Sequence, residues 1–496
     1  MASSQDEVFA ASAAQFLKMA HFLAESESFG LEHFDLERYV TEEGREMVRL
    51  MLQEHFDLRA LREVRLEEVR DVADVAYRNV ERDHQRPLAT VVGTVGVGRL
   101  AYRHRGCENL YLADAAVNLP EELHSHGLRE LAAIESSRGS FGEAKDAIFR
   151  ASGQVVGQRQ VESLARAAAL DFEAFYGCEP RPQASGKDVV VITADAKGVV
   201  MRPGELRPAT KKAAESTRHK LKTRLSPGEK ANRKRMAEVV GVYTVEPVPR
   251  SPEQVLASHD EGPKVAPEAK DKWLAASVAD EAADVIARAF AEADSRDPGH
   301  SHDWVALVDG ANHQIDVINA EAKKRGIDIT IVCDCVHVLG YIWDAAWSFF
   351  DKGDVAAEEW VREKMLEVLK GKASVVAASI RRKATYLGLE QPKRKNADVC
   401  ADYLLAKAPY LNYPKALAKG CPVGTGVIEG ACRYLVKDRL EVTGARWGLN
   451  GAEAVLKLRA LRKNGDWQRY WRFHLAQERR RVHESRYLNN VIPTAV

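Results

Sequence analysis

Apolar and polar positions along the chain predict helices first, then a small sheet. Within residues 1–85, apolar residues such as Val40, Met47 and Met51 recur near a 3.6-residue period with charged residues between them. This spacing is typical of amphipathic helices. Residues 89–118 change to clustered valines with interspersed glycines, which predict a hairpin or small sheet.

The stretch 140–176 predicts two helices joined by a short turn. The first covers about 141–151, and the second starts near Gly157 with Val161 and Leu164 on one face. Two helices linked by a glycine-bearing turn fit a helix-turn-helix that reads DNA. They fit an ordinary helical hairpin as well, and the pattern leaves both interpretations open.

Four apolar runs further along predict strands, at 189–200, 237–248, 304–311 and 327–337. A helix over 312–325 separates the last two and makes a βαβ unit with them. The stretch 270–294 predicts one further helix, and residues 338–422 are helical in pattern throughout. Strands alternating with helices indicate an α/β fold.

Length, charge and cysteine content narrow the class of protein. A chain of 496 residues is long enough for several domains, and its 72 Lys and Arg balance 72 Asp and Glu, so net charge does not identify a partner. No apolar run reaches the ~20 residues of a membrane span, and the N-terminus lacks the basic start of a signal peptide. Seven cysteines without a CxxC pair favour a reducing cytoplasm.

Candidate chemistry lies where two predicted strands end on an aspartate, at Asp195 and Asp309. Sites in open α/β sheets gather at the carboxyl ends of strands. A third acid, Glu429, begins a helix after a glycine-rich turn. Three carboxylates suit Mg²⁺ or Mn²⁺, and a pair of such ions is a device for phosphodiester displacement. Strand-terminal aspartates also cap turns, so the pattern alone leaves that alternative open.

Four segments together resemble a known family: "TADAKGVVMRP", "VDGANHQIDVI", "CDCVHVLGYIWDAA" and "GTGVIEGACRYLVKDRLEVTGARWGLNGAEAVLKLRALRKNGDWQRYW". They resemble bacterial insertion-sequence transposases of the ISKra type, relatives of the Mutator-like group, over roughly residues 90–475. The resemblance implies a ribonuclease-H-like domain whose DDE triad is Asp195, Asp309 and Glu429, binding two Mg²⁺ ions that Mn²⁺ can replace. It also implies a D-x-x-H element at Asp334 and His337.

The expected fold is therefore α/β, with a ribonuclease-H-like catalytic domain that carries an all-α insertion and follows a mainly helical DNA-binding region. The expected segments are a helical region (1–88), a small β element with a helix-turn-helix-like region (89–178), the catalytic domain (187–337 and 423–465), the insertion (338–422) and a basic C-terminal segment (466–496). Within the last segment, "QERRRVHESR" (477–486) is expected as a mobile tail. The wide spacing from Asp195 to Asp309 makes Asp334 the rival second acid. If Asp334 is not the second acid, we expect it to contact the residues that bind the metal without binding the metal itself. His337 beside it is expected to have either a catalytic or a structural role.

Basic side chains are candidates for DNA contacts. Residues 202–235 hold 12 Lys or Arg against 3 Glu, which fits either phosphate contacts or a solvated loop. Trp447 offers a stacking face for bases or packs under a turn. The full set of candidate DNA-binding residues is Lys211, Lys212, Arg218, Lys220, Lys222, Arg233, Lys234, Arg235, Arg433, Lys437, Arg446 and Trp447.

The function expected from these features is a DNA transposase that binds terminal inverted repeats, cleaves DNA and joins it to a target. Its expected partners are double-stranded DNA and further copies of itself, with no membrane and no small-molecule substrate, in the cytoplasm at the nucleoid. The alternatives are a ribonuclease-H-like nuclease or resolvase that does not join strands, and a catalytically inactive DNA-binding derivative. A strand-joining assay distinguishes a transposase from a nuclease or resolvase, which yields no joined product. DNA binding without cleavage identifies the inactive derivative.

Overall fold

The computed structural model describes residues 8–216, 233–257, 266–442 and 444–494. The chain forms two compact units: unit 1 combines residues up to Cys178 with those from Gly465 onward, and unit 2 is Glu179–Asn464. The predicted DNA contacts Arg218, Lys220 and Lys222 lie outside the described residues. Within the described ranges, no helix has the length and apolar character to cross a membrane.

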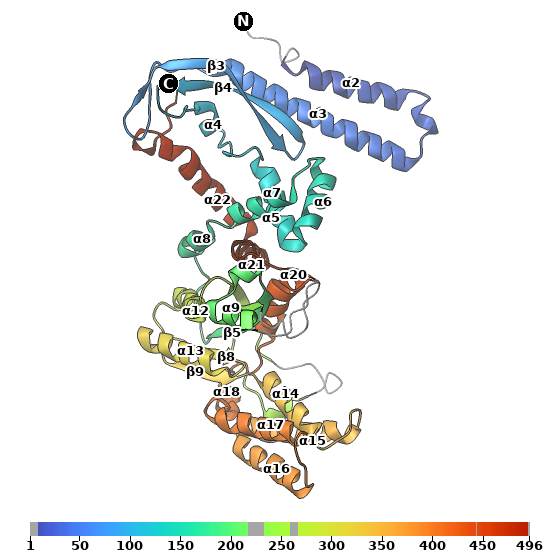
Figure 1. Ribbon diagram of the computed structural model, residues 1–496, viewed down its shortest axis with the longest axis vertical. Helices are drawn as coiled ribbons and strands as arrows, with labels where there is room; N and C mark the ends of the chain where they lie inside the picture. Colours follow the sequence, from blue (N-terminus) through green and yellow to red (C-terminus); the bar gives the residue numbers. More distant parts are fainter. Residues whose placement is uncertain (1–7, 217–232, 258–265, 443, 495–496) are drawn as a thin grey trace. The chain divides into compact units, whose positions relative to one another are not determined.

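Unit 1 contains helices and two antiparallel strand pairs (Figure 1). Its elements are α2 (Ala10–Ala24), α3 (His33–Arg62), β1 (Val69–Arg70), β2 (Ala76–Tyr77), β3 (Asn79–Thr90), β4 (Gly93–Arg103), α4 (Leu112–Ala116), α5 (His126–Arg138), α6 (Phe141–Ser152), α7 (Gln158–Ala168), α8 (Phe172–Cys178) and α22 (Trp467–Val482). The helical prediction for residues 1–85 is wrong beyond Arg62. The polar stretch 79–87 lies in β3, because β4 supplies its hydrogen-bond partners and one face stays open to solvent.

Helices α5, α6 and α7 pack together around a small core that includes Leu128, Ile148 and Leu164. α6 begins with a capping box in which Ser140 and Glu143 exchange side-chain and backbone hydrogen bonds. It ends at Gly153, whose φ of 70° is the left-handed conformation that favours glycine. The predicted pair of helices is therefore present, with boundaries within a residue or two of those expected.

The C-terminal segment is ordered, which corrects the expectation of a mobile basic tail. α22 buries His474, whose Nδ1 lies 2.6 Å from Oδ2 of Asp171. Arg481 donates two hydrogen bonds of 3.1 Å to the same carboxylate. Burial raises the pKa of Asp171, but the bonds from His474 and Arg481 outweigh this and hold the pKa below its ordinary value. The basic helix α22 is held in place because the buried Asp171 carboxylate interacts with two of its side chains, His474 and Arg481.

The substitution Asp171→Asn is expected to loosen α22. A carboxyl whose pKa is lowered by folding stabilises the protein above its unfolded pKa of about 3.9, and that contribution is lost as pH falls through the folded pKa. Hydrogen-exchange protection of α22 should therefore fall at pH 7 in the variant, and should fall in the wild type only on acidification. Asp146→Asn, at a side chain that is 64% exposed, is the control. Unchanged α22 protection in Asp171→Asn at pH 7 would contradict this account.

Unit 2 is built on a five-stranded mixed sheet in the order β7-β6-β5-β8-β9. Its strands are β5 (Val189–Val200), β6 (Lys234–Val245), β7 (Ala269–Ser277), β8 (Asp303–Val308) and β9 (Ile329–Cys333). β6 pairs antiparallel with both β5 and β7, whereas β8 is parallel to β5 and β9 is parallel to β8. The α/β class is confirmed by this sheet and the helices around it.

The prediction of one helix over 270–294 is wrong in its first half. Residues 269–277 form β7, and the helix α12 (Ala282–Arg296) starts only afterwards. The alanines in this stretch favour a helix by local propensity, but pairing with β6 and burial of Trp273 and Leu274 override it. This strand is the edge of the sheet that the sequence pattern missed.

The remaining elements of unit 2 are mainly helical (Figure 1). They are α9 (Pro208–Ser216), α11 (Pro252–Val255), α13 (Asn312–Arg325), α14 (Cys335–Ala346), α15 (Val355–Leu369), α16 (Ala373–Tyr386), α17 (Lys395–Ala406), α18 (Tyr413–Ala418), α19 (Gly426–Ala431), the π-helix η5 (Cys432–Lys437), α20 (Asp438–Leu440) and α21 (Leu449–Lys463). Helices α14–α18 pack on one another between the last strand and α19, close to the predicted insertion at 338–422.

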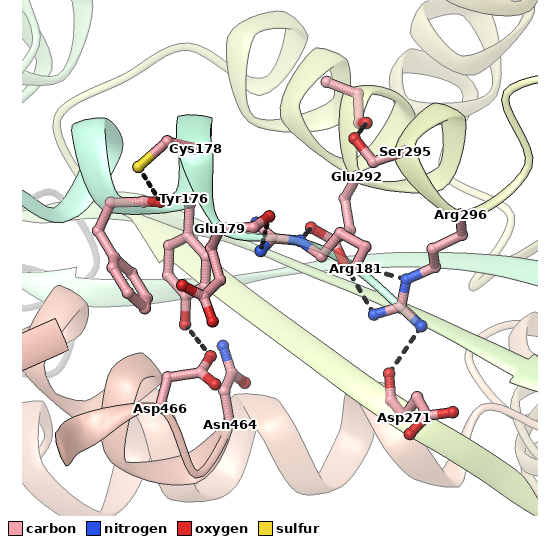
Figure 2. Close-up of polar contacts among 12 residues, drawn as sticks. Tyr176, Cys178, Glu179, Arg181, Asp271, Glu292, Ser295, Arg296, Asn464 and Asp466 are labelled. Carbon is pink, nitrogen blue, oxygen red and sulfur yellow. Dashed lines mark hydrogen bonds and ion pairs between the residues drawn. The ribbon is translucent and has the colours of Figure 1, made fainter. Parts of the chain in front are cut away.

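A buried ion network fixes the segment before β5 to α12. Figure 2 shows Arg181 and Arg296 both directed at Glu292. Arg296 donates to Glu292 from Nε at 3.0 Å and from one terminal nitrogen at 2.8 Å, and its other terminal nitrogen donates to the carbonyl of Asp271 at 2.7 Å. The side chains of Glu292 and Arg296 are 2% exposed. The network therefore connects the start of β5, α12 and β7.

Candidate active site

Three aspartates follow one another across the end of the sheet. Ala194 on β5 pairs with Val308 on β8, which pairs with Cys333 on β9. The next residue of each chain segment is Asp195, Asp309 and Asp334, respectively. Because neighbouring strands lie about 5 Å apart, this register brings the three side chains to the same edge. The two predicted acids and the rival acid are thus neighbours. The expectation that the first strand ends on Asp195 is wrong, because β6 pairs with β5 as far as Val200 and Asp195 lies within the strand, opposite Val239.

Asp195 is held at both carboxylate oxygens. Oδ1 accepts from the backbone N–H of Ala196 at 2.6 Å, and Oδ2 accepts from the thiol of Cys432 at 3.2 Å. Burial and the nearby charge of Asp195 raise the pKa of Cys432 far above its ordinary value, so the thiol stays protonated and donates. Cys432 begins the π-helix η5, a helical form that is frequent at functional sites.

Asp309 occupies a tight turn between β8 and α13. Its Oδ1 accepts from the backbone N–H of Ala311 at 2.8 Å, and no hydrogen bond to its Oδ2 is found within the described residues. Gly310 follows with φ +94°, a conformation that side chains rarely adopt. Asp309 can therefore cap the turn and bind a metal ion at the same time, because Oδ1 caps the turn and Oδ2 is available for the ion.

Asp334 is 2% exposed and joins two elements. Its Oδ1 caps α14 by accepting from Val336 N–H at 2.9 Å, and it also accepts from Thr425 N–H at 3.3 Å. The hydroxyl of Thr425 donates to Oδ2. Because Thr425 immediately precedes α19, Asp334 fixes the start of the helix that carries Glu429. This placement favours Asp309 over Asp334 as a ligand and gives Asp334 a positioning role.

Glu429 lies in the first turn of α19 and is open to solvent. Partial burial and the charges of Asp334 and Asp195 raise its pKa, while His337 opposes the shift. Glu429 is therefore electrostatically coupled to the aspartate row. His337 is exposed on α14, three residues after Asp334.

The donor chemistry of this edge suits a hard divalent cation. Within the described residues, no ion pair of Asp195, Asp309, Asp334 or Glu429 is found, and the charges of Asp334 and Asp195 raise the pKa of Glu429 against the effect of His337. Carboxylate oxygens are the ligands that Mg²⁺ and Mn²⁺ prefer. Within the described ranges, no three His, Cys, Asp or Glu side chains are arranged as a metal cluster.

The π-helix is itself supported from α21. Arg459 donates from Nε to the carbonyl of Leu435 at 2.9 Å and from a terminal nitrogen to the carbonyl of Tyr434. These bonds satisfy carbonyls in the altered turn of the helix. The carbonyl contacts fix η5, and with it the thiol that holds Asp195.

The predicted DNA contacts divide into exposed and occupied side chains. Exposed ones are Lys211, Lys212, Lys234, Arg433, Lys437 and Arg446, and Arg233 is half-buried. Arg235 instead donates to the carbonyls of Val278 and Ala279 at 2.6 and 2.7 Å. Trp447 is 6% exposed, donates to the carbonyl of Leu440 at 3.0 Å and lies under Arg439. Its burial corrects the expectation of an open stacking face, because the ring packs beneath a turn.

Sequence reasoning did not identify several side chains at this edge. Cys432 and Thr425 contact the acids from positions 237 and 91 residues away along the chain. Glu238 on β6 is a fifth nearby acid: burial, Asp195 and Asp309 raise its pKa, against His313 and Arg207. For Cys432, the spacing from Glu429 is the signal in the sequence. Three residues are about one helical turn, so the two side chains lie on the same side of the helix.

No protein-family model matches this sequence, and no curated protein matches it. Function therefore has to be inferred from the residues and their geometry.

Proposed function

We propose that this protein is a DNA transposase with a ribonuclease-H-like DDE domain that cleaves element ends and joins them to target DNA. The single observation that carries the proposal is the row of acids across neighbouring strands, beside the helix that carries Glu429. Asp195 and Asp309 follow paired positions of parallel strands, and Glu429 is coupled to Asp195. The sheet order, with β6 alone antiparallel to the others, supports the ribonuclease-H-like assignment.

In this proposal Asp195, Asp309 and Glu429 hold two Mg²⁺ ions. When bound, the ions would activate the attacking oxygen and stabilise the leaving oxygen of an in-line phosphodiester displacement. The chain's own residues orient the ligands: Cys432 directs Asp195, and Asp334 with Thr425 fixes the helix of Glu429. In cleavage, water attacks phosphorus and the 3′ oxygen leaves as a hydroxyl. In joining, that hydroxyl attacks phosphorus of a target phosphodiester, loses its proton, and the target's own 3′ oxygen leaves as a hydroxyl.

DNA recognition is proposed for unit 1 as well as for the exposed cations of unit 2. α7 buries Val161 and Leu164 against α5 and α6 and exposes Arg159, Ser163 and Arg166. Arginines and a hydroxyl on one helix face can reach base edges and phosphates in a major groove. Joining two element ends also requires at least two copies of the protein, so we propose that it assembles as a dimer or larger.

A strand-transfer assay tests the proposal against its alternatives. The substrate is a duplex from the DNA that flanks the protein's own gene, cut in advance at the element end. Mg²⁺-dependent joining to a plasmid supports a transposase. Cleavage of uncut duplex without joining favours a nuclease or resolvase, and a gel shift without cleavage in Mg²⁺ or Mn²⁺ favours an inactive DNA-binding derivative.

The substitution Thr425→Val is expected to lower the cleavage rate by about 10- to 100-fold, the usual effect of losing a residue that orients a metal ligand. Valine keeps the shape of threonine but removes the hydroxyl that donates to Asp334. Thr425→Ser, which retains a hydroxyl, should restore most of the rate. If Thr425→Val and Thr425→Ser cleave equally fast, the proposed positioning by Asp334 is wrong.

A further inference from the structure

The helical insertion reaches the turn that carries Asp309. Tyr403 on α17 donates its hydroxyl to the backbone carbonyl of Asp309 at 2.9 Å. One helical turn later, the ammonium of Lys407, which is 7% exposed, donates to the side-chain oxygen of Asn312 at the start of α13. Tyr403 of α17 and Lys407, the residue that follows this helix, thus bind residues on both sides of Gly310.

Gly310 makes this approach possible. A Cβ atom at position 310 would lie 2.8 Å from the hydroxyl oxygen of Tyr403 and 3.3 Å from its ring, and the φ of +94° is itself strained for other residues. Glycine therefore lets Tyr403 approach the turn, but it also leaves the 309–310 peptide with little intrinsic resistance to rotation. The hydroxyl of Tyr403 supplies that resistance from outside the turn.

The Tyr403 ring is itself fixed by the other helices of the insertion. It stacks on Tyr341 of α14 with ring centroids 4.0 Å apart and an interplanar angle of 21°. Tyr341 in turn meets His337 edge-on at 6.0 Å. The direction of the Tyr403 hydroxyl is therefore determined by the packing of the insertion.

We propose that Tyr403 is a positioning residue through which the helical insertion sets the divalent-cation affinity of the site formed by Asp195, Asp309 and Glu429. Its hydroxyl fixes the Asp309 carbonyl, while Ala311 N–H fixes Oδ1 of the same residue. Held at two points, the carboxylate points its remaining oxygen in one direction. The inference rests on the proposed function, because it takes Asp309 as a metal ligand.

The test measures Mn²⁺ binding by calorimetry, and DNA affinity and cleavage rate separately, in the full-length protein. Tyr403→Phe removes one oxygen atom, and we expect the Mn²⁺ dissociation constant to rise about 10- to 100-fold with DNA affinity unchanged. Tyr386→Phe, on α16 of the same insertion, is the matched control because Tyr386 is 88% exposed. Gly310→Ala perturbs the same contact from the other side and should also weaken Mn²⁺ binding.

Asp309→Ala separates failure of this inference from failure of the proposed function. Loss of Mn²⁺ binding in Asp309→Ala and Tyr403→Phe, but not in Tyr386→Phe, supports the inference. Wild-type Mn²⁺ affinity in Tyr403→Phe, with loss in Asp309→Ala, overturns the inference alone. Wild-type affinity in Asp309→Ala itself overturns the metal site that both proposals share.

Discussion

Asp195→Ala should reduce Mg²⁺-dependent DNA cleavage by about 10³-fold or more, because it removes a ligand of ions that contribute several kcal/mol to transition-state stabilisation. Asp195 lies at the centre of the candidate site, between β6 and β8 in the sheet and against Cys432. Binding to the DNA of the element end should persist, since the exposed cations and α7 are untouched. Cleavage and gel-shift assays on the same preparation measure both quantities.

Asp309→Ala and Glu429→Ala should behave like Asp195→Ala, and Asp334 provides the discriminating comparison. Asp334 is 2% exposed and accepts hydrogen bonds at both oxygens, whereas Asp195 and Asp309 are half-buried and Oδ2 of Asp309 accepts none within the described residues. We therefore expect Asp334→Asn, which keeps one acceptor oxygen, to retain partial cleavage. If Asp309→Ala stays active while Asp334→Ala is inactive, the second acid is Asp334.

Glu292→Ala should lower the free energy of unfolding of unit 2 by about 3–5 kcal/mol, the usual cost of leaving buried charges without their partner. Glu292 is the shared acceptor of Arg181 and Arg296, and Figure 2 shows both arginines converging on it. The exposed fractions of Arg181 and Arg296 are 8% and 2%, so water cannot replace the carboxylate. Urea unfolding followed by hydrogen exchange in α12 and β5 measures the loss.

Glu363→Ala is the matched control for this stability effect. Its side chain is 63% exposed and pairs with Lys364, an arrangement worth about 0–1 kcal/mol. Equal unfolding free energies for Glu292→Ala and Glu363→Ala would show that the buried network contributes no more than a surface ion pair.

The closeness of Asp195 and Asp309 could be predicted because local pattern and general topology suffice for it, although β5 continues past Asp195 to Val200. The run 189–194 is apolar and β-branched, and it ends on Asp195, while 304–308 repeats the pattern before Asp309. Parallel strands place their carboxyl ends at one edge. The helices α6 and α13 could be predicted as well, because the signals that bound them are local in sequence. These are the cap at Ser140 and the glycines at positions 153 and 326.

The missed features depend on partners distant in the chain. β7 is rich in alanine and becomes a strand because β6 lies beside it. The basic C-terminal residues are ordered because Asp171, some 300 residues earlier, accepts from Arg481. Trp447 is fixed beside β5 by its backbone N–H, which donates to the carbonyl of Val200 at 3.0 Å, and its ring is covered by Arg439. Local pattern carries no information on such pairings.

The central claim is that Asp195, Asp309 and Glu429 form one divalent-cation site. Calorimetric titration of Mn²⁺ into the full-length protein, and into a variant with all three residues changed to alanine, tests it without knowledge of the DNA sequence. We expect saturable binding by the wild type and none by the triple variant. Equal binding by the two proteins, or no saturable binding by the wild type, would contradict the claim.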